Sequence, residues 1–242
     1  MNQEVIHKQV IAAREIIFFL MRGGKSIVNL IGDIVFPKTC SGCGDTGFFL
    51  CEKCFNRIPR ADPPLSEANS FITAVFDYRN QTVRNAIWRF KYKNAREIAE
   101  CFGRVLYEEI IDEIGNDLRI GRNEKFLLIP IPLHKTRLRE RGYNQSELLA
   151  REILKYDTEK IFIIETRALS RTRATNAQAK KEKRDARFEN LRGAFAAFPE
   201  FVNKENIILI DDVTTTGATL AEARKMLIKA GAKTVRAYTV AH

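Results

Sequence analysis

Hydrophobic residues along this chain form two patterns, continuous apolar runs and helical repeats, and these alternate over its C-terminal half. Continuous runs predict strands that are buried on both faces, as in a parallel sheet, and they lie at 126–134, 161–164, 207–210 and 234–240. Helical repeats at 146–155 and 220–230 separate them, and a strand over 71–78 with helices from 80 and over 95–114 precedes them. The alternation predicts an α/β fold in which helices flank a parallel sheet.

The run at 207–210 carries the most informative chemistry, because it ends in Asp211 and Asp212 and is followed by a Thr- and Gly-containing turn. The carboxyl end of a buried strand, just before a helix, is where α/β proteins bind ligands. Backbone N–H groups at a helix start attract phosphate, and ionised Asp accepts hydrogen bonds from sugar hydroxyls. The pattern therefore predicts a site for a ribose 5-phosphate.

This segment resembles the signature of the type I phosphoribosyltransferases: four apolar residues, two acids, then a Thr- and Gly-rich loop. The resemblance implies that the acids hold the ribose hydroxyls of phosphoribosyl pyrophosphate and that the loop cradles its 5-phosphate. The implied binding residues are Asp211, Asp212, Thr215, Thr216, Gly217, Ala218 and Thr219. The alternative is an ordinary strand, turn and capped helix, since Asp and Thr also favour turns. The length of the matching run favours the binding site.

A basic segment follows the run at 126–134. We expect an extended loop over 135–145, in which alternating arginines face different ways. Cations at the end of a strand suit a second polyanionic group. In the phosphoribosyltransferases this loop receives pyrophosphate together with Mg²⁺, and the candidates here are His134, Arg137 and Arg141 in preference to Arg139. The alternative is a solvated basic loop.

Four cysteines near the N-terminal end predict a metal site. They form two C-x2-C pairs, Cys40/Cys43 and Cys51/Cys54, separated by seven residues. Two such knuckles present four thiolates to one ion, which is typical of structural zinc. An iron–sulfur cluster is the alternative that four cysteines leave open.

The chain carries a net charge of +10, which predicts affinity for polyanions without choosing among them. No apolar run is long enough to cross a bilayer and no secretory signal is visible, so we expect a cytoplasmic protein that is not integral to a membrane. The polar stretch 167–192, helical over 174–188, is expected to be a lid over the site or a nucleic-acid footprint. Lys91 and Lys93 are expected to be solvated, and the alternative is that they reach into the ligand cleft. Trp88 is expected to lie in or beside the core.

Taken together, these features resemble the competence protein F family, also called ComF, ComFC or GntX-like. The resemblance rests on the cysteines, 90–92, 130–134, 139–145 and 211–219. It implies a four-cysteine zinc ribbon over 37–60 and a phosphoribosyltransferase-like domain over 70–242, and a linker with Pro59, Pro63 and Pro64 follows the ribbon. The helical repeats near the N-terminal end predict a further extension over 1–36, which lies outside the resemblance. The implied role is in DNA uptake during natural transformation.

Two functions remain open at this stage. One is a phosphoribosyltransferase of unknown acceptor, which binds phosphoribosyl pyrophosphate with Mg²⁺, or binds a nucleotide. The other is a non-catalytic adaptor that binds single-stranded DNA or a competence helicase through its basic loops and zinc module. Stacking aromatics beside the cations favour the adaptor, and the sequence offers only Tyr143 and Phe188 in those positions.

Overall fold

The computed structural model describes residues 38–61, 69–120, 124–172 and 193–242. The helices predicted within residues 1–36, the prolines Pro63 and Pro64, the residue Phe188 and the helix predicted over 174–188 lie outside the described residues.

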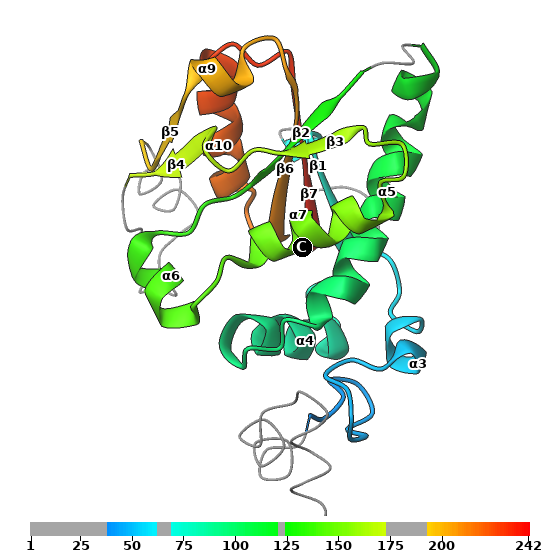
Figure 1. Ribbon diagram of the computed structural model, residues 1–242. Coiled ribbons are helices and arrows are strands. Elements are labelled where there is room, and N and C mark those ends of the chain that lie inside the picture. The colour runs from blue at the N-terminus through cyan, green and yellow to red at the C-terminus, as the bar shows by residue number, and fades with distance from the viewer. Residues whose placement is uncertain (1–37, 62–68, 121–123, 173–192) are drawn as a thin grey trace, which may run out of the picture.

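A five-stranded parallel sheet forms the centre of the molecule (Figure 1). Its strands are β1 (Ile72–Phe76), β2 (Phe126–Pro130), β3 (Phe162–Ile164), β6 (Asn206–Val213) and β7 (Thr234–Ala241), in the order β1-β7-β6-β2-β3. Ile210 of β6 pairs with Pro130 of β2 on one side and with Tyr238 of β7 on the other. All pairings in this sheet are parallel, so the carboxyl ends of the strands meet at one edge.

Helices and a small second sheet cover both faces of this sheet. On one face lie α5 (Ile98–Ile120) and α7 (Gln145–Tyr156); on the other lie α10 (Ala218–Lys229), α9 (Pro199–Val202) and the antiparallel pair β4 (Leu169–Arg171) and β5 (Phe195–Ala197). Both faces of strand β6 are buried, which explains why its sequence is continuously apolar. Ile208 and Ile210 pack with α5 and α7, while Ile207 and Leu209 pack on the α10 side.

Helix α4 (Gln81–Tyr92) lies across the carboxyl edge of the sheet, between it and the four-cysteine module with its short helix α3 (Glu52–Phe55) (Figure 1). The apolar side of α4 is fully buried, for example at Val83 and Phe90. The module shares this core, because the ring of Phe55 meets Phe76 edge-on at 5.9 Å between centroids. The predicted fold class, an α/β parallel sheet flanked by helices with an N-terminal four-cysteine module, is confirmed.

One local prediction was wrong. Residues 135–141 are not an extended loop but a short helix, α6 (Lys135–Arg141), which ends at Gly142 in the left-handed conformation with φ 75°. Strand β4, which was not predicted, lies near the start of the stretch 167–192. Within the described residues, no helix is both long and apolar enough to cross a bilayer.

Candidate functional site

The acid pair at the end of β6 lies where the sequence predicted, at the carboxyl edge of the sheet. The hydroxyl of Ser146 on α7 donates to Asp211 Oδ1 over 3.0 Å, and the N–H of Asp212 donates to the same oxygen over 2.9 Å. Asp212 is buried and pairs with Lys91, whose Nζ lies 2.8 Å from Asp212 Oδ1. Asp211 remains partly exposed, so the pair is not sealed in an apolar core.

Lys91 contacts Asp212 directly and acts on Asp211 through its charge. Loss of water around Asp211 and the neighbouring charge of Asp212 raise the pKa of Asp211 to about 7, against the opposing effect of Lys91. The acid pair therefore takes up or releases a proton near neutral pH. Such shifts are concentrated at functional sites.

The turn after β6 leaves several of its amides without an acceptor among the described residues. The N–H of Thr214 donates to the carbonyl of Ala241 over 3.0 Å, which ties the start of the turn to β7. Beyond it, the N–H groups of residues 215–217 and of Thr219 donate to no acceptor among the described residues. They lie at the first turn of α10, where the helix dipole also favours an anion.

Gly217 and Asn69 fix the shape of this turn. Gly217 has φ 73°, a left-handed conformation that favours glycine, and it precedes the first residue of α10. The Asn69 amide donates to the carbonyl of Thr216 over 3.2 Å and lies so close that a Cβ on Gly217 would fall 2.8 Å from it. Asn69 is itself buried. The turn therefore requires glycine for two reasons, its backbone conformation and its contact.

The basic segment after β2 leaves the same edge of the sheet. His134 caps α6 by accepting from the N–H of Thr136 over 3.3 Å. Arg137 and Arg141 are four residues apart on this helix and therefore lie on one face, while Arg139 does not. Arg141 donates to Gln145 Oε1 over 2.9 Å, so the structure directs it toward the start of α7.

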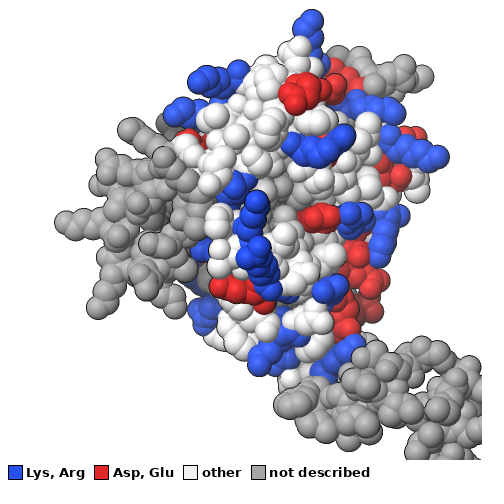
Figure 2. Space-filling view, turned by 60° about the vertical axis from the view of Figure 1, so that its left-hand side comes forward, with Lys and Arg blue, Asp and Glu red and all other residues white. Residues whose placement is uncertain are grey.

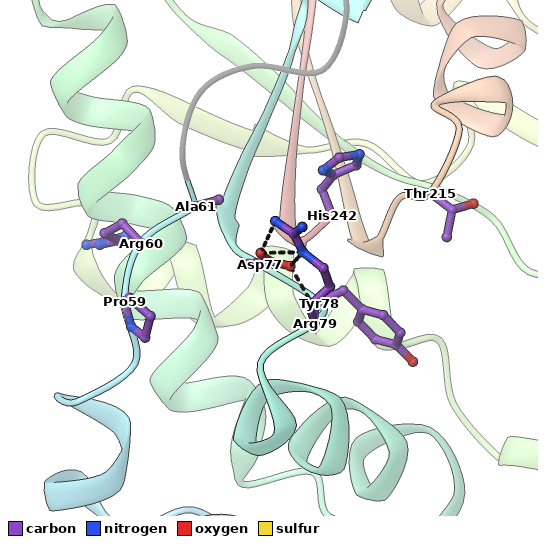
Figure 3. Close-up of a pocket in the computed structure, with 8 residues that line it drawn as sticks. All are labelled: Pro59, Arg60, Ala61, Asp77, Tyr78, Arg79, Thr215 and His242. Atoms are coloured by element: carbon purple, nitrogen blue, oxygen red, sulfur yellow. Dashed lines mark hydrogen bonds and ion pairs between the residues drawn. The ribbon is translucent and has the colours of Figure 1, made fainter.

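A cavity of about 720 Å³ opens on the other side of the turn, at the ends of β1 and β7 (Figure 3). Thr215 forms one wall, and the lining residues are Pro59, Arg60, Ala61, Asp77, Tyr78, Arg79, Thr215 and His242. Asp77 and Arg79 form an ion pair within it, with an Arg79 nitrogen 2.7 Å from Asp77 Oδ2. The same hydrogen bonds from Arg79 lower the pKa of Asp77. The cavity volume is in the range that holds a small organic molecule.

The four predicted cysteines converge on one point. Their sulfur atoms all lie within 4.8 Å of one another, with Cys40 and Cys51 at 3.6 Å and Cys43 and Cys51 at 3.8 Å. These separations are too long for disulfides, whose S–S bond is about 2.05 Å. They agree with the edge of a ZnS4 tetrahedron, about 3.8 Å for Zn–S bonds of about 2.3 Å.

The surroundings of the cluster also suit a metal thiolate. The N–H groups of Gly42 and Cys51 lie 3.4 and 3.3 Å from Cys40 Sγ and donate to it. Burial opposes ionisation of this thiol, but these donors prevail and lower the pKa of Cys40 to about 6. The cluster can therefore hold a structural metal ion such as zinc.

An exposed row of cations and aromatic rings runs along α4 to α6. We call it the aromatic ladder; its members, in order of contact, are Lys93, Trp88, Tyr92 and Arg141. Lys93 lies 5.5 Å from the Trp88 ring, the Trp88 and Tyr92 rings are 6.1 Å apart, and Arg141 lies 5.2 Å from Tyr92. Trp88 is 49% exposed and Tyr92 59%, so the prediction that Trp88 belongs in or beside the core was wrong. Tyr143, predicted as a stacking ring, is buried instead and bonds to the carbonyl of Phe90.

Three residues of the site beside β6 were not predicted. Lys91 was expected at the solvated surface, which was wrong, while Ser146 and Asn69 were not singled out at all. Each comes from a part of the chain far from β6, so only the folded arrangement brings it to the acids. The one usable signal was the Phe90-Lys91-Tyr92 segment, where a lysine interrupts an aromatic pair.

Comparison with known proteins gives consistent results. The chain is 29% identical over 217 residues to DNA utilization protein YhgH of Escherichia coli O6:H1, covering 83% of this chain and 87% of that protein. It is 28% identical over 211 residues to competence protein F of Haemophilus influenzae, covering 85% of each. It is 32% identical over 168 residues to competence protein ComFC of Bacillus subtilis, covering 69% of this chain and 62% of that protein.

Two further comparisons add less. No family model matches the chain. A solved structure, the glutamine phosphoribosylpyrophosphate amidotransferase from B. subtilis complexed with ADP and GMP, aligns with a TM-score of 0.35 and 17% identity, covering 59% of this chain and 26% of that one. That likeness is too distant to carry an argument. The chain therefore has homologues named competence protein F, competence protein ComFC and DNA utilization protein YhgH, and their similarity extends over most of its length.

Proposed function

We propose that the chain binds phosphoribosyl pyrophosphate, or a nucleotide built on the same sugar phosphate, at the end of β6. The observation that supports this most is the pairing of two features within nine residues: carboxylates at Asp211 and Asp212, and the amides of 215–217 and Thr219, which donate to no acceptor among the described residues. The first suits a sugar diol and the second a phosphate. A ligand that carries both groups on one ribose satisfies both halves of the site.

In this proposal each part of the turn has a role. The amides of residues 215–217 and 219 and the hydroxyls of Thr215, Thr216 and Thr219 hold the 5-phosphate. Gly217 and Ala218 leave room for the phosphate to approach the backbone, and Asn69 fixes the turn from behind. Asp211 and Asp212 accept the ribose hydroxyls.

The pyrophosphate group would lie toward β2, the neighbour of β6 in the sheet. His134, Arg137 and Arg141 follow that strand, and the helical form of α6 places the two arginines on one face. Guanidinium groups suit pyrophosphate oxygens because they donate in a planar fork. Mg²⁺ bound with this ligand would neutralise charge on the leaving group.

The cavity beside Thr215 favours transfer over binding alone. It lies at the ends of β1 and β7, on the side of β6 away from β2 and the basic helix (Figure 3). A nucleophile placed there faces the anomeric carbon from the side opposite to the leaving group. The acceptor's bond to that carbon then forms as the bond to pyrophosphate breaks, the electron pair leaves with pyrophosphate, and the acceptor's N–H proton passes to water. Positioning of this kind supplies much of a transferase's rate.

We further propose a role for the chain in DNA uptake. Relatives named competence protein and DNA utilization protein match it over most of its length. In that setting a sugar-phosphate ligand is either a substrate or a signal of nucleotide supply.

A second candidate function, an adaptor on single-stranded DNA, is favoured by the aromatic ladder. Successive bases stack on exposed rings while cations beside them track the backbone, and base stacking contributes about 1–3 kcal/mol per base. Trp88 and Tyr92 supply the rings, and Lys93 and Arg141 the cations. Over the face shown in Figure 2, lysine and arginine side chains are spread among acidic ones rather than gathered in one block. The ladder is therefore a more specific candidate than charge alone.

Isothermal titration with phosphoribosyl pyrophosphate and Mg²⁺ tests the binding proposal. Asp211→Asn with Asp212→Asn removes two charge-assisted acceptors, each contributing about 1.5–3 kcal/mol, so we expect the affinity to fall by about 100-fold or more. An unchanged affinity in a folded double variant would rule the assignment out. Release of labelled pyrophosphate against a panel of nitrogen acceptors then separates the two functions, because only a transferase releases it in response to an added acceptor.

A further inference from the structure

We propose that Lys91 is a positioning residue for the sugar site, holding Asp212 as an ionised acceptor for a ligand hydroxyl. This inference rests on the proposed function, and it names a residue from outside the strand and turn that carry the acids. The starting observation is the ion pair of Lys91 Nζ and Asp212 Oδ1 at 2.8 Å, in which the side chains are 19% and 9% exposed. An ion pair with so little water around it is rarer than a surface pair and needs a reason.

The packing of α4 leaves Lys91 little freedom. Phe90, its neighbour in sequence, is fully buried, and the hydroxyl of Tyr143 donates to the carbonyl of Phe90. This anchors the last turn of α4 over the carboxyl edge of the sheet. Lys91 then reaches the acids, while Lys93 lies over the exposed ring of Trp88. The position of Lys91 is therefore fixed by the buried residues of α4 that precede it, and not by a contact on the surface that could rearrange.

The charges around the acid pair make this one ammonium group important. Asp211 lies beside Asp212 on β6, and the charge of Asp212 disfavours ionisation of Asp211. Arg171 of β4 also acts on Asp211 electrostatically, and the Tyr143 hydroxyl lies near Asp212. Ser146 of α7 is neutral and donates to Asp211. Among the direct contacts described for the two carboxylates, Lys91 is the one that brings a positive charge.

The need for ionisation comes from the ligand. An ionised carboxylate offers only acceptors, whereas a protonated one turns one oxygen into a donor and no longer matches a sugar hydroxyl at that position. Without Lys91 the acid pair would hold a proton to higher pH. As pH falls, the acid pair becomes protonated and its affinity for a diol is lost. Because removal of the lysine favours protonation, the pH at which half of this affinity is lost should rise.

A purely structural ion pair gives a different result. If Lys91 only fastened α4 to β6, its loss would lower the stability of the fold but leave the pH at half-maximal ligand affinity unchanged. The pH profile of binding therefore distinguishes positioning from fastening. Lys91→Arg, which keeps the charge, should retain a profile close to that of the wild type.

The experiment is titration of the full chain with phosphoribosyl pyrophosphate and Mg²⁺, and separately with ribose 5-phosphate, between pH 5.5 and 8.5. For Lys91→Met we expect affinity at pH 7 to fall by about 10-fold and the midpoint to rise by about one pH unit, which is the effect of one lost charge contact. Lys233→Met is the matched control. Lys233 Nζ lies 2.7 Å from Glu124 Oε1 at the opposite edge of the sheet, and its loss should leave both values unchanged.

A double variant keeps the test decisive if Lys91→Met alone does not fold. Lys91→Met with Asp212→Asn removes both partners of the ion pair, and at pH 8.5, where Asp211 is ionised, its affinity should match that of Asp212→Asn alone because the lysine contacts Asp212. An additional loss in the double variant, or a wild-type profile in Lys91→Met, would overturn the inference. If the wild-type chain binds neither probe, the proposed function itself is wrong, and that outcome is distinct from both.

Discussion

The four-cysteine module and the acid site beside β6 are encoded in the sequence in different ways. All four sulfurs of the module come from fifteen consecutive residues, and they meet within 4.8 Å through two local turns. The acid site combines β6 with Lys91 from α4, Ser146 from α7 and Asn69 from the segment before β1. The four-cysteine module can be recognised from the spacing of its residues in the sequence. The acid site is assembled from distant segments, so the sequence reveals only its longest continuous segment, which is β6 and the turn after it.

The largest expected effect concerns the four-cysteine module and tests whether its four thiolates together hold the metal ion. Cys43→Ser removes one of four thiolates, so we expect bound zinc to fall from about one equivalent to near zero and the knuckles to unfold, since metal binding and folding are coupled in such modules. Elemental analysis and hydrogen exchange over 38–58 measure both. Cys101→Ser, a cysteine outside the cluster, is the control and should keep full zinc. Iron with acid-labile sulfide in the purified protein would contradict the zinc assignment.

The next largest effect concerns the turn after β6, which contains Gly217. Gly217→Ala forces a side chain into a left-handed position against Asn69, which costs about 1–3 kcal/mol of strain. We expect affinity for phosphoribosyl pyrophosphate to fall by about 10-fold or more. Gly115→Ala is the matched control, because an added Cβ there meets nothing within 4 Å and alanine favours helix. Equal affinity in both variants would show that the turn does not hold the ligand.

A smaller effect is expected on the affinity of the chain for single-stranded DNA. Trp88→Ala removes one ring of the aromatic ladder and about 1–3 kcal/mol of stacking, so single-stranded DNA should bind about 5- to 100-fold more weakly. Filter binding with a poly-dT strand across a salt series measures the change. Ile228→Ala, an exposed apolar residue of α10 outside the ladder, is the control. A loss of the same size in both would remove the ladder from consideration.

A last prediction concerns the stability of the fold and its dependence on pH. Since the pKa of Asp211 is raised to about 7, the folded chain keeps a proton on it that the unfolded chain has already lost above about pH 4. Its ionisation therefore costs stability increasingly from pH 4 to 7 and by a constant amount above 7. Asp211→Asn, which cannot ionise, should gain stability relative to wild type over that window. Urea unfolding of both proteins from pH 5 to 8.5 measures the difference, and a flat difference would contradict the raised pKa.

Much of the fold followed from hydrophobic patterning because parallel strands are apolar on both faces, as Ile207 to Ile210 are. The segment 135–141 was mistaken for a loop because its helix is short, carries no fully buried residue and has only Leu138 as an aliphatic side chain. The prediction that Lys91 is solvated considered only the charge of its side chain. In the structure its position depends on the burial of the neighbouring residue Phe90, which that argument left out. The aromatic ladder was missed because Arg141 joins Tyr92 only through the contact of α6 with α4.

Helix α4 has a consequence for both regions. Toward the four-cysteine module, Asn85 donates to the carbonyl of Ser41 over 3.3 Å and Arg89 donates to Thr39 Oγ1 over 3.0 Å. Toward the sheet, Lys91, two residues beyond Arg89, pairs with Asp212. The same helix therefore contacts both regions, and under the proposed function we expect loss of the metal from the module to weaken ligand binding at the acid pair as well.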